Sequence, residues 1–189
     1  MDMPRESWEL MTTLAAADPA ARTARSQWTV HDLVAHLAAG AKENADLIED
    51  ALAGRPARAT RTFAEREAAF VAMPDERLRQ ELVVQSSRKL TAVERLAARG
   101  PDATYQFTGR PFSAALARTH GRSEAAIHRW DIAGDDQTGM ELLAAPELTR
   151  HAVEMLAIWG RRAPDHPVSV IADPKLWAPV ATVLWDATP

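Results

Sequence analysis

The chain has 189 residues, which is long enough for a single domain with a packed core. With 47% hydrophobic and 25% charged residues, it is too apolar to be intrinsically disordered. The formal net charge of −4 gives no electrostatic basis for binding nucleic acid or anionic membranes. Cysteine is absent, which excludes disulfides, Cys-ligated zinc and cysteine nucleophiles, so any metal must be held by His, Asp or Glu.

The sequence contains no run that approaches the roughly 18 apolar residues of a membrane span. Residues 1–6 are mixed in charge and lack the apolar core of a signal peptide. We therefore expect a cytoplasmic protein whose partners include neither a membrane nor a nucleic acid.

Helical periodicity dominates the chain, because apolar residues recur at three-to-four spacing and Pro or Gly follows most of these runs. Thr29 is expected to cap the second helix in a capping box with Asp32, and Asp75 to cap the next long helix. The predicted helices span residues 6–17, 30–52, 63–73, 75–99, 111–133 and 146–159, and residues 103–109 are expected to be extended.

The chain changes character after Pro164. Segments 167–171 and 179–184 are short, β-branched and bounded by proline, which predicts strands. Two short strands do not form an independent domain. We therefore expect an all-α bundle over residues 1–163, followed by a short tail over 164–189 that packs on the bundle or begins a larger missing part.

Three polar residues of the predicted 111–133 helix form a row. His120, Glu124 and His128 are spaced by four, so they lie on one side of the helix, and Leu116 and Ile127 flank them near the buried stripe. A carboxylate on an apolar stripe is costly unless it is paired or binds a cation. Spacing of i,i+4 lets Glu124 and His128 share one divalent ion, which gives half of a metal site.

His36 is the candidate for a third ligand. It lies in the middle of the predicted 30–52 helix, at the edge of its apolar stripe beside Leu37. Two facing helices of an antiparallel bundle would bring His36 to the Glu124 and His128 pair. Three protein ligands would leave a fourth position open to water or substrate, as in catalytic zinc sites.

Other interpretations of these residues stay open on spacing alone. An E-x-x-x-H pattern is common on unrelated helices, and a single His36 is more often a hydrogen-bonded histidine between helices. For His120 the alternatives are a replacement for one of the metal ligands, a residue that contacts a ligand, or a solvated group. For Asp131 they are a hydrogen bond to a ligating imidazole or a role in ending the helix. Surface positions are expected for His31, His151 and His166, a solvated helix face for Arg118, Arg122 and Arg129, and core or lid positions for Trp28 and Trp130.

Two segments together resemble a known family. Residues 27–37, QWTVHDLVAHL, resemble the W-T-V-x-D-L-V-x-H-L segment of the mycothiol-dependent maleylpyruvate isomerase family. Residues 124–132, EAAIHRWDI, resemble that family's later E-x-x-x-H-x-W-D-L segment. The spacing between the two segments and the residues Phe107-Thr108-Gly109 also match. The resemblance covers residues 7–161.

The resemblance implies a DinB-like, up-and-down four-helix bundle with an extra helix and a divalent metal, usually zinc, with nickel as the alternative. His36 matches the family's first ligand, Glu124 its acidic ligand and His128 its second histidine. Family members usually carry a second, α+β domain after the bundle. The 164–189 tail is too short for that domain, so we expect its remnant or a substitute lid.

The resemblance also implies a function. A low-molecular-weight thiol, mycothiol or a similar one, would replace the metal-bound water, and the metal-bound thiolate would attack a small electrophile, as in an S-transferase or isomerase. Asp131 and His120 are the candidate catalytic residues, which orient a ligand or move a proton. The expected partners are the thiol and the electrophilic substrate, and homodimer formation is left open. The alternatives are a metal-dependent hydrolase that activates water and a non-enzymatic metal- or ligand-binding bundle.

Overall fold

The computed structural model describes residues 3–24 and 27–151. These residues divide into two compact units: those between 13 and 118 form the central unit, and residues 3–12 with 119–151 form the terminal unit. The strands predicted at 167–171 and 179–184 and the predicted surface residue His166 lie outside the described residues. None of the helices in the described ranges combines the length and apolar character that crossing a bilayer requires.

The central unit is mainly helical, as the all-α expectation requires. Its main elements are α2 (Val30–Leu52), α3 (Phe63–Val71), α4 (Asp75–Ala97), β1 (Thr104–Phe107) and β2 (Arg110–Ser113).

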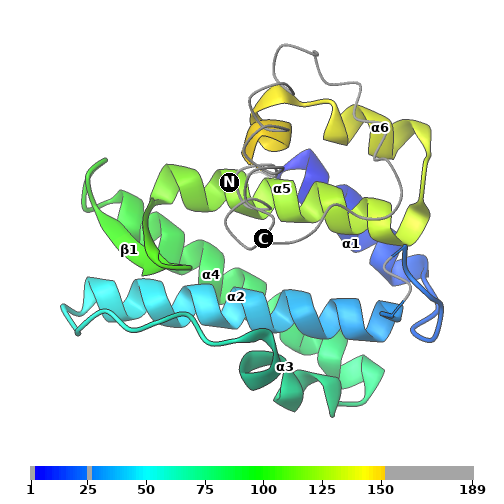
Figure 1. Ribbon diagram of the computed structural model, residues 1–189, viewed down its shortest axis with the longest axis horizontal. Coiled ribbons are helices and arrows are strands. Elements are labelled where there is room, and N and C mark those ends of the chain that lie inside the picture. Colours follow the sequence, from blue (N-terminus) through cyan, green and yellow to red (C-terminus); the bar gives the residue numbers. More distant parts are fainter. Residues whose placement is uncertain (1–2, 25–26, 152–189) are drawn as a thin grey trace, which may run out of the picture. The chain divides into compact units, whose positions relative to one another are not determined.

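The two long helices of the central unit, α2 and α4, lie side by side (Figure 1). His31 pairs with Asp75 near the start of both helices, and Glu49 pairs with Arg88 toward their ends, so α2 and α4 run parallel. The connection 53–74, which contains α3, returns the chain to the start of α2. A simple up-and-down order would instead make two consecutive long helices antiparallel.

The start of α2 follows directly from its sequence. The Thr29 side chain accepts a hydrogen bond from the Asp32 N–H at 3.2 Å, and the Asp32 carboxylate accepts one from the Thr29 N–H at 2.8 Å. This reciprocal pair is the predicted capping box. Small and aliphatic residues then bury α2 on several sides, including Leu33, Val34 and Ile48. A well-capped, deeply buried helix is a rigid support for His36.

Two expectations for α4 are wrong. Asp75 does not cap the helix, because Pro74 occupies the N-cap position and the Asp75 carboxylate binds His31 instead. The helical spacing of Val83 and Leu90 with the other apolar residues of the predicted 75–99 helix would place them on its buried side, but they are 51% and 49% exposed. The buried stripe of α4 is narrower than its apolar content suggests and consists of Leu78, Leu82, Ala92, Val93 and Leu96.

A tight hairpin delays the start of the next helix. Residues 103–109 are extended as expected over β1, but β2 pairs with β1 in antiparallel register, with Tyr105 opposite Phe112. Thr108 and Gly109 form the turn with φ of 51° and 81°, the two positive values that a two-residue turn of this kind needs. The helix predicted from residue 111 therefore begins only after β2, as α5 (Ala114–Ala133).

The terminal unit contains the first part of α1 (Arg5–Ala16), most of α5, α6 (Gln137–Leu143) and a helical segment at 146–151. Helix α6 was not predicted, because seven residues with Gly139 among them show no usable periodicity. The Asp136 side chain caps it by accepting a hydrogen bond from the Gly139 N–H at 2.6 Å. A small core of Ala126, Leu142 and Leu148 joins these elements.

Candidate functional site

Two of the predicted metal ligands lie together on α5. His128 Nε2 is 3.4 Å from Glu124 Oε2, as i,i+4 spacing on a helix allows. The His128 side chain is 2% exposed, whereas that of Glu124 is 24% exposed. An imidazole nitrogen and a carboxylate oxygen therefore face each other at the edge of the buried region.

Asp131 holds the other side of the same ring. His128 Nδ1 lies 2.7 Å from Asp131 Oδ2, and both side chains are buried. A carboxylate only accepts, so Nδ1 carries the proton of this hydrogen bond and Nε2 is the atom turned toward Glu124. The hydrogen bond suggested from the sequence for Asp131 is therefore present.

The two carboxylates set the charge preference of His128. Burial lowers the pKa of the imidazole, but the hydrogen bonds and charges of Asp131 and Glu124 outweigh burial and raise the pKa to about 9. The position between Glu124 and Asp131 therefore stabilises a positive charge, which either a proton or a cation can supply.

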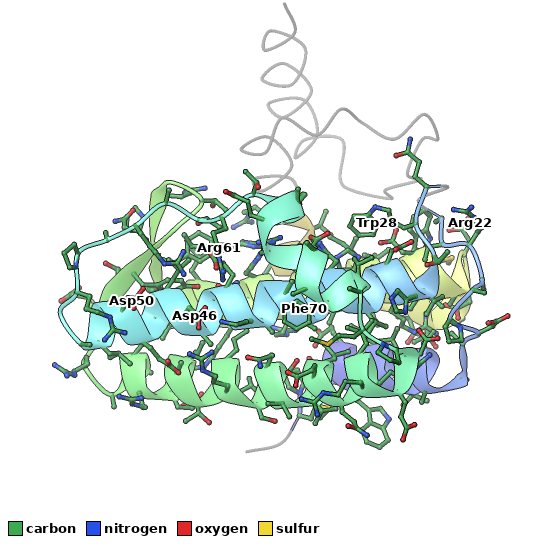
Figure 2. The ribbon with its side chains drawn as sticks, turned by 90° about the horizontal axis from the view of Figure 1, so that it is seen from below. Arg22, Trp28, Asp46, Asp50, Arg61 and Phe70 are labelled. Carbon is green, nitrogen blue, oxygen red and sulfur yellow. The ribbon has the colours of Figure 1, made fainter. Side chains whose placement is uncertain are left out.

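His36, on α2 in the central unit, is arranged in the same way. Its Nδ1 lies 2.7 Å from Glu67 Oε1, and the ring is 4% exposed. Trp28, at the N-terminal end of α2 (Figure 2), packs with a ring-centre distance of 5.0 Å, and the Phe63 ring meets His36 edge-on at 5.3 Å. Hence each histidine of the predicted ligand set has a carboxylate on Nδ1.

Sequence reasoning did not find Glu67. Nothing in the local pattern marks it, because it lies on the short helix α3, 31 positions after His36, and reaches His36 only through the packing of α3 on α2. Its position four residues after Phe63, which also contacts His36, becomes meaningful only once α3 is placed.

His120 is engaged differently from the other members of its row. Its Nδ1 lies 3.0 Å from His151 Nε2, and both rings are buried. The surface position expected for His151 is therefore wrong. His151 lies in the helical segment 146–151, next to the small core that α5 shares with α6.

Several other expected surface groups are paired or buried. Arg129, expected on a solvated face, is 6% exposed and forms a two-pronged pair with Asp136 at 2.8 and 2.7 Å. His31 is half-buried, with Nε2 3.0 Å from the Val71 carbonyl oxygen and Nδ1 on Asp75. By contrast Arg118 is exposed as expected and pairs with Glu94 at 2.9 Å.

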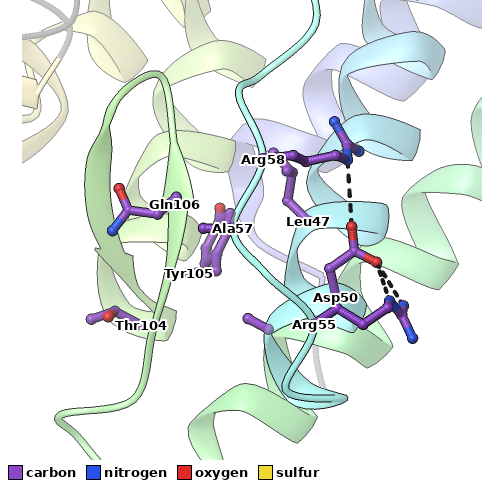
Figure 3. Close-up of a pocket in the computed structure, with 9 residues that line it drawn as sticks. Leu47, Asp50, Arg55, Ala57, Arg58, Thr104, Tyr105 and Gln106 are labelled. Carbon is purple, nitrogen blue, oxygen red and sulfur yellow. Dashed lines mark hydrogen bonds and ion pairs between the residues drawn. The ribbon is translucent and has the colours of Figure 1, made fainter.

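A small pocket in the central unit is separate from these residues. It has a volume of about 100 Å³ and is lined by the end of α2, residues 55–58 and β1 (Figure 3). Arg55 and Arg58 both reach Asp50, at 2.6 and 3.4 Å, so each cation in the wall has an acidic partner. Sites for small molecules are usually several hundred Å³, so this pocket is too small for a substrate-sized ligand.

A comparison with models of known protein families identifies the family of the chain. The model for the mycothiol maleylpyruvate isomerase N-terminal domain matches residues 2–133, which include His36 and end with the last residue of α5. The chain belongs to this family. Membership agrees with the resemblance carried by residues 27–37 and 124–132.

Solved structures show that the fold extends to distant relatives. Two structures of the mycothiol-dependent maleylpyruvate isomerase, one of them a histidine-to-alanine mutant, match with a TM-score of 0.60. They are 20% and 19% identical to this chain, and each match covers 74% of this chain and 64% of the other. The chain thus spans less than two thirds of the length of these enzymes. No curated protein sequence gives a significant match.

Proposed function

We propose that the chain binds a divalent metal, zinc or alternatively nickel, through His36, Glu124 and His128, and uses it to activate a low-molecular-weight thiol such as mycothiol. The thiol sulfur would then attack a small electrophile, in an isomerase or S-transferase reaction. The observation that carries the proposal is the arrangement on α5 in which Glu124 and Asp131 flank the buried ring of His128, within the region that matches the family.

The chemistry of the donors fits a divalent metal. The three residues offer two imidazole nitrogens and one carboxylate oxygen, the ligand types of a His₂Glu catalytic zinc site, which leaves one position for an exchangeable ligand. Ligating histidines in such sites usually donate their other ring N–H to a carboxylate or carbonyl. Asp131 accepts from His128 and Glu67 from His36, so both rings meet this requirement.

When bound, the cation supplies Lewis acidity that lowers the pKa of a coordinating thiol, which makes the sulfur nucleophilic at neutral pH. The protein's own residues bind the metal and orient its ligands. Asp131 fixes which nitrogen of His128 is available, and Trp28 and Phe63 pack against the His36 ring. In this scheme Asp131 positions a ligand and does not itself touch the substrate.

His120 is proposed to hold or move a proton. Its Nδ1 and His151 Nε2 are 3.0 Å apart, a distance at which one proton is shared between the two rings. An imidazole donates a proton from one ring nitrogen and accepts one at the other, as a proton carrier in an isomerisation must. Replacement of His120 should therefore lower the turnover rate without loss of the metal.

Metal content is the experiment that tests the proposal. Wild-type protein, His128→Ala and His31→Ala should be purified without chelators and analysed by elemental mass spectrometry, before and after incubation with zinc. His31 is a matched control, because it lies on α2 but pairs with Asp75. About one equivalent of zinc in wild type and His31→Ala, with a strong loss in His128→Ala, is the expected result.

Thiol binding is tested next, by titration of mycothiol and of glutathione into zinc-loaded protein. Maleylpyruvate is the first electrophile to assay, because the similar solved enzyme is a maleylpyruvate isomerase. Wild-type protein that takes up no zinc would overturn the proposal. Zinc-loaded protein that binds no thiol but cleaves esters or amides would replace it with the hydrolase interpretation.

A further inference from the structure

We propose that Glu67 is a positioning residue for the metal centre: its carboxylate fixes the ring orientation and the tautomer of His36. The inference rests on the proposed function, in which His36 is a ligand. It concerns a residue outside the two family-like segments, on a helix that contributes no ligand itself.

The first support is the geometry of the pair. Glu67 Oε1 lies 2.7 Å from His36 Nδ1, and the two side chains are only 15% and 5% exposed. Because the carboxylate accepts, it holds the proton of the imidazole on Nδ1 and leaves Nε2 as the coordinating nitrogen. Without this acceptor, neutral imidazole can carry its proton on either nitrogen, and the tautomer protonated at Nε2 cannot bind a metal there.

The second support is the packing around the pair. Trp28 and Phe63 both contact the His36 ring, so the ring cannot turn without losing these contacts and the bond to Glu67. The Arg66 guanidinium lies 4.5 Å from the centre of the Phe63 ring, and its Nε is 3.8 Å from Glu67 Oε1. Arg66 thus contacts both Phe63 and Glu67, the two side chains of α3 that meet the His36 ring.

The third support is the way in which α3 is anchored to α2. A capping box of Thr62 and Glu65 starts α3. Arg61, which precedes Thr62 in the segment that leads into α3 (Figure 2), is bound by the buried carboxylate of Glu43. Glu43 and His36 are seven residues apart on α2, which places them on the same side of the helix, two turns apart. Helix α3 is therefore attached to this side of α2 at two points, and the second point is the Glu67–His36 bond.

A purely structural role for Glu67 makes a different prediction from a positioning role. Removal of one partner from a buried carboxylate–imidazole pair lowers the stability of the fold whatever the role of the pair, because the other partner loses its hydrogen bond. If Glu67 merely ties α3 to α2, its removal changes stability but not the state of His36 in the folded protein. If Glu67 positions the ligand, the tautomer of His36 and the zinc affinity change as well.

The experiment compares Glu67→Ala and Glu67→Gln with wild type and with Glu76→Ala, which removes an exposed carboxylate of α4. The tautomer of His36 is measured by nitrogen-15 NMR on metal-free protein, and the zinc Kd by competition with a chromophoric chelator. We expect Nδ1–H in wild type, loss of this preference and about 10- to 100-fold weaker zinc binding in Glu67→Ala, and no change in Glu76→Ala. Glu67→Gln keeps an acceptor oxygen at the same place and should retain the tautomer.

The outcomes separate this inference from the proposed function. An unchanged tautomer and an unchanged zinc Kd in folded Glu67→Ala would overturn the role of Glu67 while leaving the metal centre in place. If wild-type protein binds no zinc, the proposed function fails. The His36 tautomer in metal-free protein still tests whether Glu67 orients the ring, and an Nε2–H tautomer in wild type would overturn the inference.

Discussion

The Glu43 carboxylate binds both the backbone and the side chain of Arg61: it accepts hydrogen bonds from the Arg61 backbone N–H at 2.9 Å and from Arg61 Nε at 2.7 Å. Arg58 Nη1 adds a third contact at 2.7 Å. Glu43 is fully buried in the middle of α2, so these donors compensate for the cost of removing its charge from water. The cluster fixes the approach to α3, and with it Phe63 and Glu67 beside His36.

Replacement of Glu43 should therefore destabilise the protein. We expect Glu43→Gln to lower the free energy of unfolding by about 2 kcal/mol, since it weakens several charge-assisted hydrogen bonds to partly exposed arginines. Urea denaturation followed by circular dichroism measures the change. Glu49→Gln is the control, because the Glu49 carboxylate is 30% exposed and its pair with Arg88 should contribute less than 1 kcal/mol. Equal effects of the two substitutions would contradict this view of Glu43.

The same carboxylate predicts a pH dependence of stability. Burial raises the pKa of Glu43, but the hydrogen bonds from Arg58 and Arg61 outweigh burial and lower it from 4.5 to about 2. A depressed pKa in the folded state contributes stability above the unfolded-state value, and this stability is lost as the pH falls. Between about pH 4.5 and pH 2, wild type should therefore lose unfolding free energy faster than Glu43→Gln. Denaturation curves at pH 6, 4 and 3 give the two slopes, and parallel slopes would count against the assignment.

The parts of the fold that depend on local chemistry were predictable from the sequence. Thr29 and Asp32 form their capping box between neighbouring residues, so the start of α2 needs no tertiary information. The start of α5 was missed because the choice between helix and strand at residues 110–113 is made by pairing with β1. Propensity alone does not contain that partner.

In the candidate site, too, the contacts within one helix were predictable from the sequence, and those between elements were not. Glu124, His128 and Asp131 are close in sequence on one helix, so their spacing predicts their contacts. Glu67 reaches His36 from another helix, and His151 reaches His120 from a segment beyond α6. Such contacts across elements depend on how the helices pack, which a pattern along a single chain does not specify.

Asp131 should tune metal binding through His128. We expect Asp131→Ala to weaken zinc binding about 10- to 100-fold, because the ring loses the acceptor that holds its Nδ1–H. Asp135→Ala is the matched control: this aspartate accepts a hydrogen bond from Trp130 Nε1 at 2.8 Å and has no contact with a ligand candidate among the described residues. Chelator competition at pH 7.5 measures both dissociation constants. A zinc Kd for Asp131→Ala that equals that of Asp135→Ala would show that His128 needs no such support.

Removal of the metal should destabilise wild-type protein but leave a ligand mutant unaffected. A cation that binds only the folded chain stabilises it by RT ln(1 + [L]/Kd), which is about 2.7 kcal/mol when free zinc is 100 times its Kd. We therefore expect the Tm of wild type to rise by several degrees with zinc and to return to its starting value with EDTA. His128→Ala should show neither shift, because the donor pair with Glu124 is broken. His31→Ala should start from a lower Tm, since its bonds to Asp75 and Val71 are lost, but its Tm should still rise with zinc. Differential scanning fluorimetry at a fixed protein concentration measures all three. A zinc-dependent rise of equal size in His128→Ala would place the stabilising ion elsewhere on the chain and would remove the support for a centre at His36, Glu124 and His128.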